Sequence, residues 1–147
     1  MKLSTKGRYG LKAMFELALH YGEGPIPLKM IAENQDISEH YLEQLIAILK
    51  KNGLVNSIRG AQGGYLLSEQ PSKIIVGDII RSLEGDISLV SCVKDEKLCP
   101  SSKSCVTKLV WEKISTSINS VIDNITLQDM IDEHIRINSN GEYMYYI

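Results

Sequence analysis

Residues 28–67 contain two helix-like segments, a tight turn and a glycine-rich hairpin, and this succession constrains the fold more than any other part of the chain. Pro27 suits the start of a short helix over residues 28–33, because its fixed φ angle and missing N–H are tolerated there. A turn over residues 34–37 leads to Ser38, whose hydroxyl can cap a third helix that ends near Gly53. This pattern is typical of a helix-turn-helix, whose second helix lies in the major groove of DNA.

Two short predicted strands follow, over residues 54–58 and 65–67. Their connection over residues 59–64 contains three glycines, which permit the positive φ angles of a tight hairpin tip. A hairpin directly after a helix-turn-helix is a wing. We therefore predict a mainly α fold with a small β-hairpin wing, a winged helix-turn-helix followed by a long C-terminal dimerisation helix.

Helices are also predicted on both sides of this unit. The first runs from Ser4 or Thr5 to about His20, and another covers residues 76–83. Apolar residues then recur at alternating spacings of three and four: Trp111, Ile114, Ile118, Val121 and Ile125. Such a seam is typical of a helix that packs against another subunit or another long helix. Thr126 with Asp129 predicts a last helix through about Ile135.

These segments suggest four parts. We expect a winged helix-turn-helix DNA-binding domain over residues 1–84 and a cysteine-bearing loop over residues 85–107. Dimerisation helices should cover residues 108–136, and a C-terminal tail residues 137–147.

Charge is distributed unevenly along the chain. The net charge is −2, but residues 1–81 carry ten Lys and Arg against eight Asp and Glu, whereas residues 82–147 carry six against ten. This asymmetry indicates that only the front half meets a polyanion. No apolar run approaches the roughly 20 residues of a membrane span, and the N-terminus lacks the apolar stretch of a signal peptide. We therefore expect a cytoplasmic protein without a membrane partner.

Candidate DNA contacts lie at the start of the third helix and at the hairpin tip. On the helix they are Ser38, His40, Glu43 and Gln44, because bases are contacted near the N-terminus of a recognition helix. The Glu43 carboxylate would repel phosphate unless it faces a cytosine amino group, so it is a candidate for specificity. At the tip, an arginine can enter a narrow minor groove or bind guanine, while glycine amides approach phosphates. These tip residues are Arg59 and Gly60. The alternative is a solvated helix face beside an ordinary hairpin.

Three cysteines, Cys92, Cys99 and Cys105, lie in or beside one irregular segment. Their odd number argues against a disulfide framework, and their spacing is too wide for a zinc knuckle. Three thiolates on one loop can ligate an iron–sulfur cluster, because soft sulfur matches iron. Unrelated cysteines, a zinc site and a thiol switch remain open on spacing alone.

Three sequence motifs together resemble the IscR/CymR family of winged-helix regulators. They are residues 3–10 (LSTKGRYG), residues 41–45 (YLEQL) and the stretch from Ser57 to Tyr65. The resemblance covers nearly the whole chain and implies a homodimer on a pseudo-palindromic double-stranded operator. It also implies that Glu43, Ser57 and Arg59 read bases.

The IscR branch has a similar three-cysteine loop, so the resemblance implies an iron–sulfur cluster on Cys92, Cys99 and Cys105, with 2Fe–2S favoured over 4Fe–4S. The fourth ligand is unknown. The branch has a histidine three residues after the last cysteine, where this chain has Lys108, and a related branch has an aspartate where this chain has Arg8. A protonated lysine cannot ligate iron.

The chain ends in a run of aromatic residues and isoleucine, and this ending is similar to that of CymR-type proteins. The resemblance implies that Tyr145, Tyr146 and Ile147 bind cysteine synthase; the alternative is a tail packed on the dimer.

Two regulatory functions follow. The first is a repressor of iron–sulfur assembly genes, cysteine metabolism genes or both, with its DNA affinity set by the cluster. The alternative is a cysteine-metabolism repressor controlled by cysteine synthase, without a functional cluster. An enzyme is not expected, because no His/Asp constellation lies near a cysteine and no glycine-rich phosphate loop is present.

Overall fold

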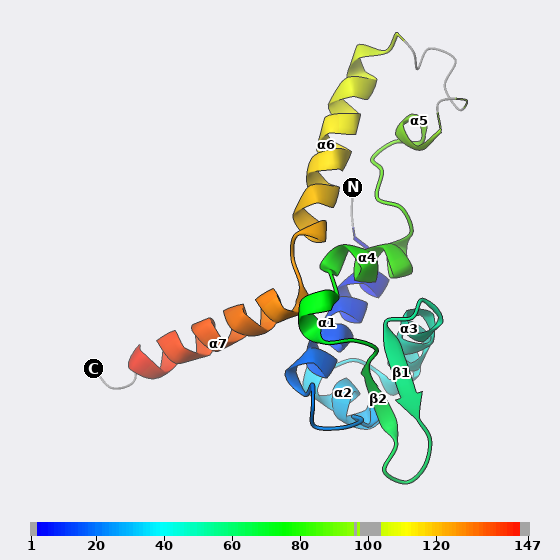
Figure 1. The fold of residues 1–147 in the computed structure, drawn as a ribbon. Helices are drawn as coiled ribbons and strands as arrows, with labels where there is room; N and C mark the ends of the chain where they lie inside the picture. The colour runs from blue at the N-terminus through cyan, green and yellow to red at the C-terminus, as the bar shows by residue number, and fades with distance from the viewer. Residues whose placement is uncertain (1–2, 96, 98–103, 145–147) are drawn as a thin grey trace.

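The computed structural model describes residues 3–95, 97 and 104–144. In chain order its elements are α1 (Thr5–Leu19), α2 (Leu28–Gln35), α3 (Glu39–Lys51), β1 (Val55–Ile58), β2 (Gly64–Leu67), the 3-10 turn η1 (Pro71–Lys73), α4 (Val76–Glu84), α5 (Ser91–Lys94), α6 (Val106–Asp123) and α7 (Leu127–Met144). In Figure 1 the elements from α1 to α4 form one globular unit, from which α6 and α7 project in different directions.

The predicted mainly α fold with a β-hairpin wing is confirmed. β1 and β2 form a two-stranded antiparallel sheet in which Ser57 pairs with Tyr65. Ser4 caps α1 by accepting a hydrogen bond from the backbone N–H of Lys6, and Ser38 caps α3. Between α2 and α3, Asp36 has a φ angle of 53°, a left-handed conformation that turns the chain within one residue.

The core of the globular unit lies between α1, α2, α3, the hairpin and α4. Its largest fully buried side chains include Met14, Leu17, Ile31, Leu42, Leu45, Ile46, Leu49, Val55, Ile79 and Leu127. Four of them repeat along α3 at helical spacing, which leaves the opposite face of that helix in solvent. The side chain of Leu127 belongs to α7, so the last helix is part of this core.

Glycines allow α1 to approach α4 closely. A Cβ atom at Gly7 would lie 2.6 Å from Oε1 of Glu84, and one at Gly10 would overlap the side chain of Leu83. Because no such atom is present, the last turn of α4 lies directly on the first two turns of α1.

The chain breaks between α6 and α7, where the predicted seam was expected to continue. The backbone N–H of Val76 donates to the carbonyl of Ile125 at 2.8 Å, and that of Leu127 donates to the carbonyl of Ile74 at 3.0 Å. The placement of Ile125 on the seam helix is therefore wrong. The predicted cap of the next helix is confirmed, since Thr126 and Asp129 exchange hydrogen bonds of 2.9 and 3.1 Å.

Other features also differ from the prediction, and α2, for example, continues to Gln35, two residues beyond its predicted end. The end of the last helix near Ile135 is wrong, because α7 continues to Met144. Side-chain pairs one turn apart favour this continuation: Gln128 with Asp132, Glu133 with Arg136, and His134 with Asn138. The cysteine-bearing segment also contains one helical turn, α5.

The two longest helices, α6 and α7, have 18 residues each. In the described part of the chain, no helix is both long and apolar enough to cross a membrane.

Candidate nucleic-acid interface and cysteine loop

The predicted helix contacts lie together on the first half of α3. His40, Glu43 and Gln44 are exposed, and the ring Nε2 of His40 lies 3.3 Å from the amide nitrogen of Gln44. The Oγ of Ser38 accepts a hydrogen bond from the backbone N–H of Tyr41 at 3.3 Å, so this oxygen caps the helix. Because the buried stripe fixes the rotation of α3, these polar groups share the solvent face.

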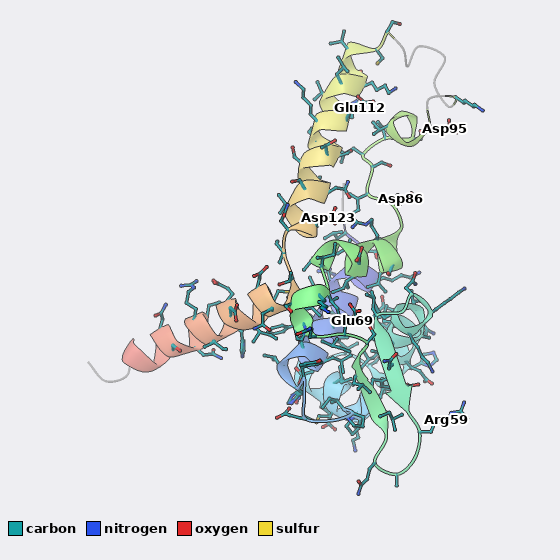
Figure 2. The ribbon with its side chains drawn as sticks, viewed as in Figure 1. Arg59, Glu69, Asp86, Asp95, Glu112 and Asp123 are labelled. Carbon is teal, nitrogen blue, oxygen red and sulfur yellow. The ribbon has the colours of Figure 1, made fainter. Side chains whose placement is uncertain are left out.

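The predicted wing contacts lie at the end of β1 and in the following tip. Arg59 is exposed and projects from the wing into solvent (Figure 2). Gly60 has a φ angle of 116°, which L side chains rarely adopt, so the tip requires glycine there. Ser57 is half-buried, on the same face of β1 as the buried Val55, whereas Asn56 and Ile58 are exposed. The tip therefore presents a cation and backbone amides to solvent.

A lysine that the sequence analysis did not select links the two groups. The ammonium group of Lys50, in the last turn of α3, donates a hydrogen bond to Oγ of Ser57 at 2.6 Å. Lys50 is seven residues from Glu43, or two helical turns, so it extends the exposed face that begins at His40. Local periodicity identifies Lys50 only as a surface residue, because its partner lies in the next element.

The wing is also tied to the chain before α2. Ile26 and Tyr65 exchange two backbone hydrogen bonds of 2.8 Å. Gly64 permits this approach, since a Cβ atom there would lie 2.9 Å from the backbone nitrogen of Pro27. Strand β2 is therefore hydrogen-bonded to β1 and also to the segment before α2.

The start of α1 contacts the recognition helix. The hydroxyls of Thr5 and Tyr41 share a hydrogen bond of 2.9 Å, and the rings of Tyr9 and Tyr41 meet edge to face at 6.0 Å. These contacts fix the first turn of α3 relative to α1. The hydrogen bond joins residues 36 positions apart, and neither contact was predicted.

A buried carboxylate, that of Glu16, accepts hydrogen bonds from the last two residues of α2, just before the turn into α3. Glu16 is 4% exposed and accepts hydrogen bonds from Asn34 at 2.6 Å and from Gln35 at 2.7 Å. His20 places one ring nitrogen 3.1 Å from Glu16 and the other 2.5 Å from Glu23. Burial lowers the pKa of His20, but the hydrogen bonds and charges of Glu23 and Glu16 outweigh it, so the pKa is raised above its ordinary value. The imidazole is therefore part of this carboxylate cluster.

The thiol of Cys105 occupies the N-cap position of α6. Its sulfur lies 3.1 Å from the hydroxyl of Thr107. This hydrogen bond, the backbone N–H groups of Lys108 and Thr107 and the charge of Lys108 lower the pKa of Cys105. A thiolate is the form that ligates iron, so Cys105 fits a ligand role. Lys108 does not: its side chain is buried and its ammonium lies 3.6 Å from Glu112.

The other cysteines are less fully described. The backbone of Cys92 lies in α5, whereas Cys99 lies outside the described residues. Among the described side chains, no group of three or more His, Cys, Asp and Glu is placed to hold a metal ion. The predicted tail contacts Tyr145, Tyr146 and Ile147 also lie outside the described residues.

The segment that leads from α4 to the cysteines is held on α6. Asn119 donates to the carbonyl of Ile87 at 3.2 Å and accepts from Arg81 at 3.0 Å. Arg81 also pairs with Asp123 at 2.5 Å, where α6 meets the globular unit (Figure 2). An open cavity of about 660 Å³ lies beside this segment, with Asp86, Val93 and Glu112 in its lining.

Several large apolar side chains of α6 are exposed in the single protomer: Val106, Leu109, Val110, Trp111, Ile114 and Val121. Trp111 is 36% exposed and Val121 59% exposed. A large exposed apolar surface of this kind is typical of an interface with another chain.

Residues 3–133 match the sequence profile of the family described as Rrf2, iron-dependent transcriptional regulator. The chain is 48% identical over 150 residues to the HTH-type transcriptional regulator CymR of Bacillus subtilis (strain 168), and the match covers 100% of both chains. It is 43% identical over 132 residues to the HTH-type transcriptional regulator IscR of Yersinia pestis, with 90% of this chain and 80% of that protein covered.

Solved structures of an IscR and of a CymR are also similar to this chain. The IscR of T. potens superimposes with a TM-score of 0.75 at 54% identity, covering 91% of this chain and 88% of that one. CymR (YrzC), the global cysteine regulator of B. subtilis, superimposes with a TM-score of 0.76 at 49% identity, covering 90% and 98%.

Proposed function

This chain belongs to the Rrf2 family of transcriptional regulators, which are not enzymes, and we propose that it is a repressor that reads its operator with α3 and the wing. The observation that carries the proposal is the row of exposed polar side chains on α3, of which Lys50 is hydrogen-bonded to Ser57 of the wing, next to the exposed Arg59. The proposed base-reading residues are Glu43, Ser57 and Arg59. Ser38, His40, Gln44 and Gly60 support them with contacts to the backbone or neighbouring bases.

Selection of bound duplexes from a random library tests this proposal. We expect the full-length protein to enrich a pseudo-palindromic site with two related half-sites, because a two-fold dimer places two recognition helices about one or more helical turns apart. In the Glu43→Ala variant, we expect relaxed preference at one base pair in each half-site. A library without enrichment would contradict the proposal.

We propose that the operator is bound by a homodimer that buries the exposed apolar surface of α6. Support comes from the large apolar side chains that α6 exposes and from the predicted seam, of which Trp111, Ile114 and Val121 are exposed in one protomer. Light scattering tests the assignment. The wild-type protein should have the mass of two chains, and Trp111→Glu with Val121→Glu should shift the mass toward one chain while the far-UV spectrum is kept.

We propose that Cys92, Cys99 and Cys105 hold an iron–sulfur cluster, with 2Fe–2S favoured and the fourth ligand unassigned. Support comes from the iron dependence of the family and from the lowered pKa of Cys105. When bound, a cluster would supply an iron- and redox-responsive input. The protein's part is to hold the loop on α6 through Asn119 and to lower the pKa of Cys105, which favours the thiolate that ligates iron.

A second candidate function is a cysteine-metabolism repressor controlled by cysteine synthase through Tyr145, Tyr146 and Ile147. The 48% identity to CymR over the whole of both chains favours it. Deletion of these three residues should abolish binding to cysteine synthase; unchanged binding would contradict this candidate.

Anaerobic purification separates the two functions. The cluster proposal predicts a coloured protein with bound iron and sulfide, and an operator affinity that changes when iron is removed. A colourless protein with unchanged affinity would favour the second candidate. Either function places the protein in the cytoplasm, where reduced thiols persist.

A further inference from the structure

Lys50 is placed between the two elements that are proposed to read DNA. It extends from the last turn of α3, and its ammonium group donates to Oγ of Ser57 in β1 at 2.6 Å. Lys50 is exposed and Ser57 is half-buried, and their contact is open to solvent. Ala47 is also exposed on α3 between Glu43 and Lys50, so no bulky residue separates this contact from the rest of the proposed reading face.

The chemistry of the pair fixes the direction of the hydrogen bond. An ammonium group has three donors and no acceptor, so the Ser57 oxygen must accept. The hydroxyl proton of Ser57 then points elsewhere. Within residues 3–95, 97 and 104–144, the Lys50 contact is the one hydrogen bond to this hydroxyl. The Ser57 proton is therefore available to an outside acceptor, and the adjacent positive charge strengthens its donor character.

We propose that Lys50 is a positioning residue that makes the Ser57 hydroxyl a hydrogen-bond donor and so determines which base edge Ser57 selects. A serine without such a partner bonds to donors and acceptors alike, because its hydroxyl rotates to suit either. With Lys50 in place, one lone pair of the Ser57 oxygen is occupied and the adjacent positive charge disfavours a second donor, so Ser57 prefers an acceptor on the DNA. The inference rests on the proposed role of Ser57 in base reading and adds that Ser57 is the hydrogen-bond donor in that contact.

Base edges differ in whether they present hydrogen-bond donors or acceptors in each groove. In the major groove, guanine presents only the acceptors N7 and O6 and thymine presents O4, whereas cytosine presents an amino donor. In the minor groove, A·T pairs present only acceptors and G·C pairs add a donor. A Ser57 hydroxyl that Lys50 biases toward donation therefore discriminates against the cytosine amino edge in the major groove, or against the guanine amino group in the minor groove.

The alternative for Lys50 is a direct contact with phosphate. Such a contact would strengthen binding to all sequences equally and would contribute about one unit to the slope of log affinity against log salt. It would not alter the preference for one base over another. The two roles are therefore distinguished by base preference, and overall affinity alone does not separate them.

The test uses the full-length protein and a panel of duplexes derived from the selected operator, in which each base pair of one half-site is changed in turn. Affinities are measured at constant salt for wild type, Ser57→Ala, Lys50→Met, Lys50→Arg and the Ser57→Ala/Lys50→Met double variant. Lys51→Met is the matched control, because Lys51 is the neighbouring exposed lysine on α3. Thermal unfolding verifies that each variant is folded.

We expect Ser57→Ala to identify one base pair at which discrimination falls by about threefold to tenfold, the range of one neutral hydrogen bond. Lys50→Met should lose the same discrimination at the same base pair, and the double variant should lose no more, since both changes remove one contact. Lys50→Arg, which also has only donors, should retain the preference, as should Lys51→Met.

Retention of the wild-type base preference by Lys50→Met would overturn the inference, whatever happens to overall affinity. Failure of Ser57→Ala to change any preference would overturn both the inference and the base-reading role of Ser57. A wild-type protein that binds no member of the panel would contradict the proposed function itself.

Discussion

The carboxylate of Glu84, the last residue of α4, accepts a hydrogen bond from the backbone N–H of Ser4 at 3.0 Å. The same oxygen lies 2.5 Å from the Ser4 hydroxyl and 3.0 Å from the backbone nitrogen of Gly7. A residue at the end of α4 therefore caps the first turn of α1. Because α1 also contacts Tyr41 through Thr5, the end of α4 and the start of α3 both contact the first turn of α1.

Replacement of Glu84 by alanine should destabilise the protein. The change leaves N–H groups at the start of α1 without an acceptor, and loss of a helix cap costs about 1 kcal/mol. Urea unfolding measures the difference. Glu69→Ala is the matched control, because the Glu69 side chain is exposed (Figure 2). Equal loss of stability in the two variants would contradict the capping role of Glu84.

The pH dependence of this cap has a defined sign. The hydrogen bond from Ser4 and those from the backbone of Gly7 and Ser4, together with the charge of Lys6, outweigh the opposing effect of burial and lower the pKa of Glu84 below its ordinary value of 4.5. The resulting stability is present above pH 4.5 and is lost as the pH falls through the lower pKa of the folded protein. The stability advantage of wild type over Glu84→Gln should therefore shrink in acid. If the stability difference between wild type and Glu84→Gln stayed constant as the pH fell, Glu84 would not be ionised in the folded protein.

Gly10→Ala should destabilise the protein although alanine favours helix by about 1 kcal/mol. The added methyl group overlaps the side chain of Leu83, so the buried Leu83 must leave its rotamer or α1 and α4 must separate. Leu83→Ala provides the space, and the double variant should therefore be less destabilised than the sum of the single changes. Strict additivity of the two unfolding free energies would show that these helices do not meet at Gly10.

His20 should make stability fall with rising pH. Both ring nitrogens face carboxylate oxygens, of Glu16 and Glu23, so the network is satisfied when the ring carries both protons. Because the folded pKa is raised above 6.5, the stabilisation is complete below about pH 6.5 and is lost as the pH rises through the folded pKa. His20→Gln should remove this component from the urea midpoint. Persistence of the same pH slope in His20→Gln would assign it to another group.

Local sequence signals predicted most of the fold, because caps and periodicity act over a few residues. Ser38 and the apolar stripe fixed the start and rotation of α3, and the glycines after Arg59 marked the wing. The predictions were wrong where contacts between residues distant in the sequence determine the structure. The alternation of apolar residues could not reveal that Ile125 leaves α6 to pair with the segment before α4. For the same reason, the seam continued too far in the prediction.

The candidate site was predicted as a set of residue types and positions, but its connections were not. Lys50 with Ser57, Thr5 with Tyr41 and Glu84 with Ser4 are separated by 7, 36 and 80 residues. Each pair joins two secondary-structure elements, so neither partner has a local signature that identifies the other.

The most direct test of the account is the affinity of the full-length protein for its selected operator with and without the Arg59 side chain, measured by fluorescence anisotropy at constant salt. Arg136→Met is the matched control, because Arg136 lies on α7 and pairs with Glu133 away from the proposed interface. Arg59→Met should weaken operator binding by about 5-fold to 150-fold, the range for an arginine bound to a base edge, and Arg136→Met should not weaken it. Equal operator affinity of wild type and Arg59→Met would contradict the assignment of α3 and the wing as the DNA-reading surface.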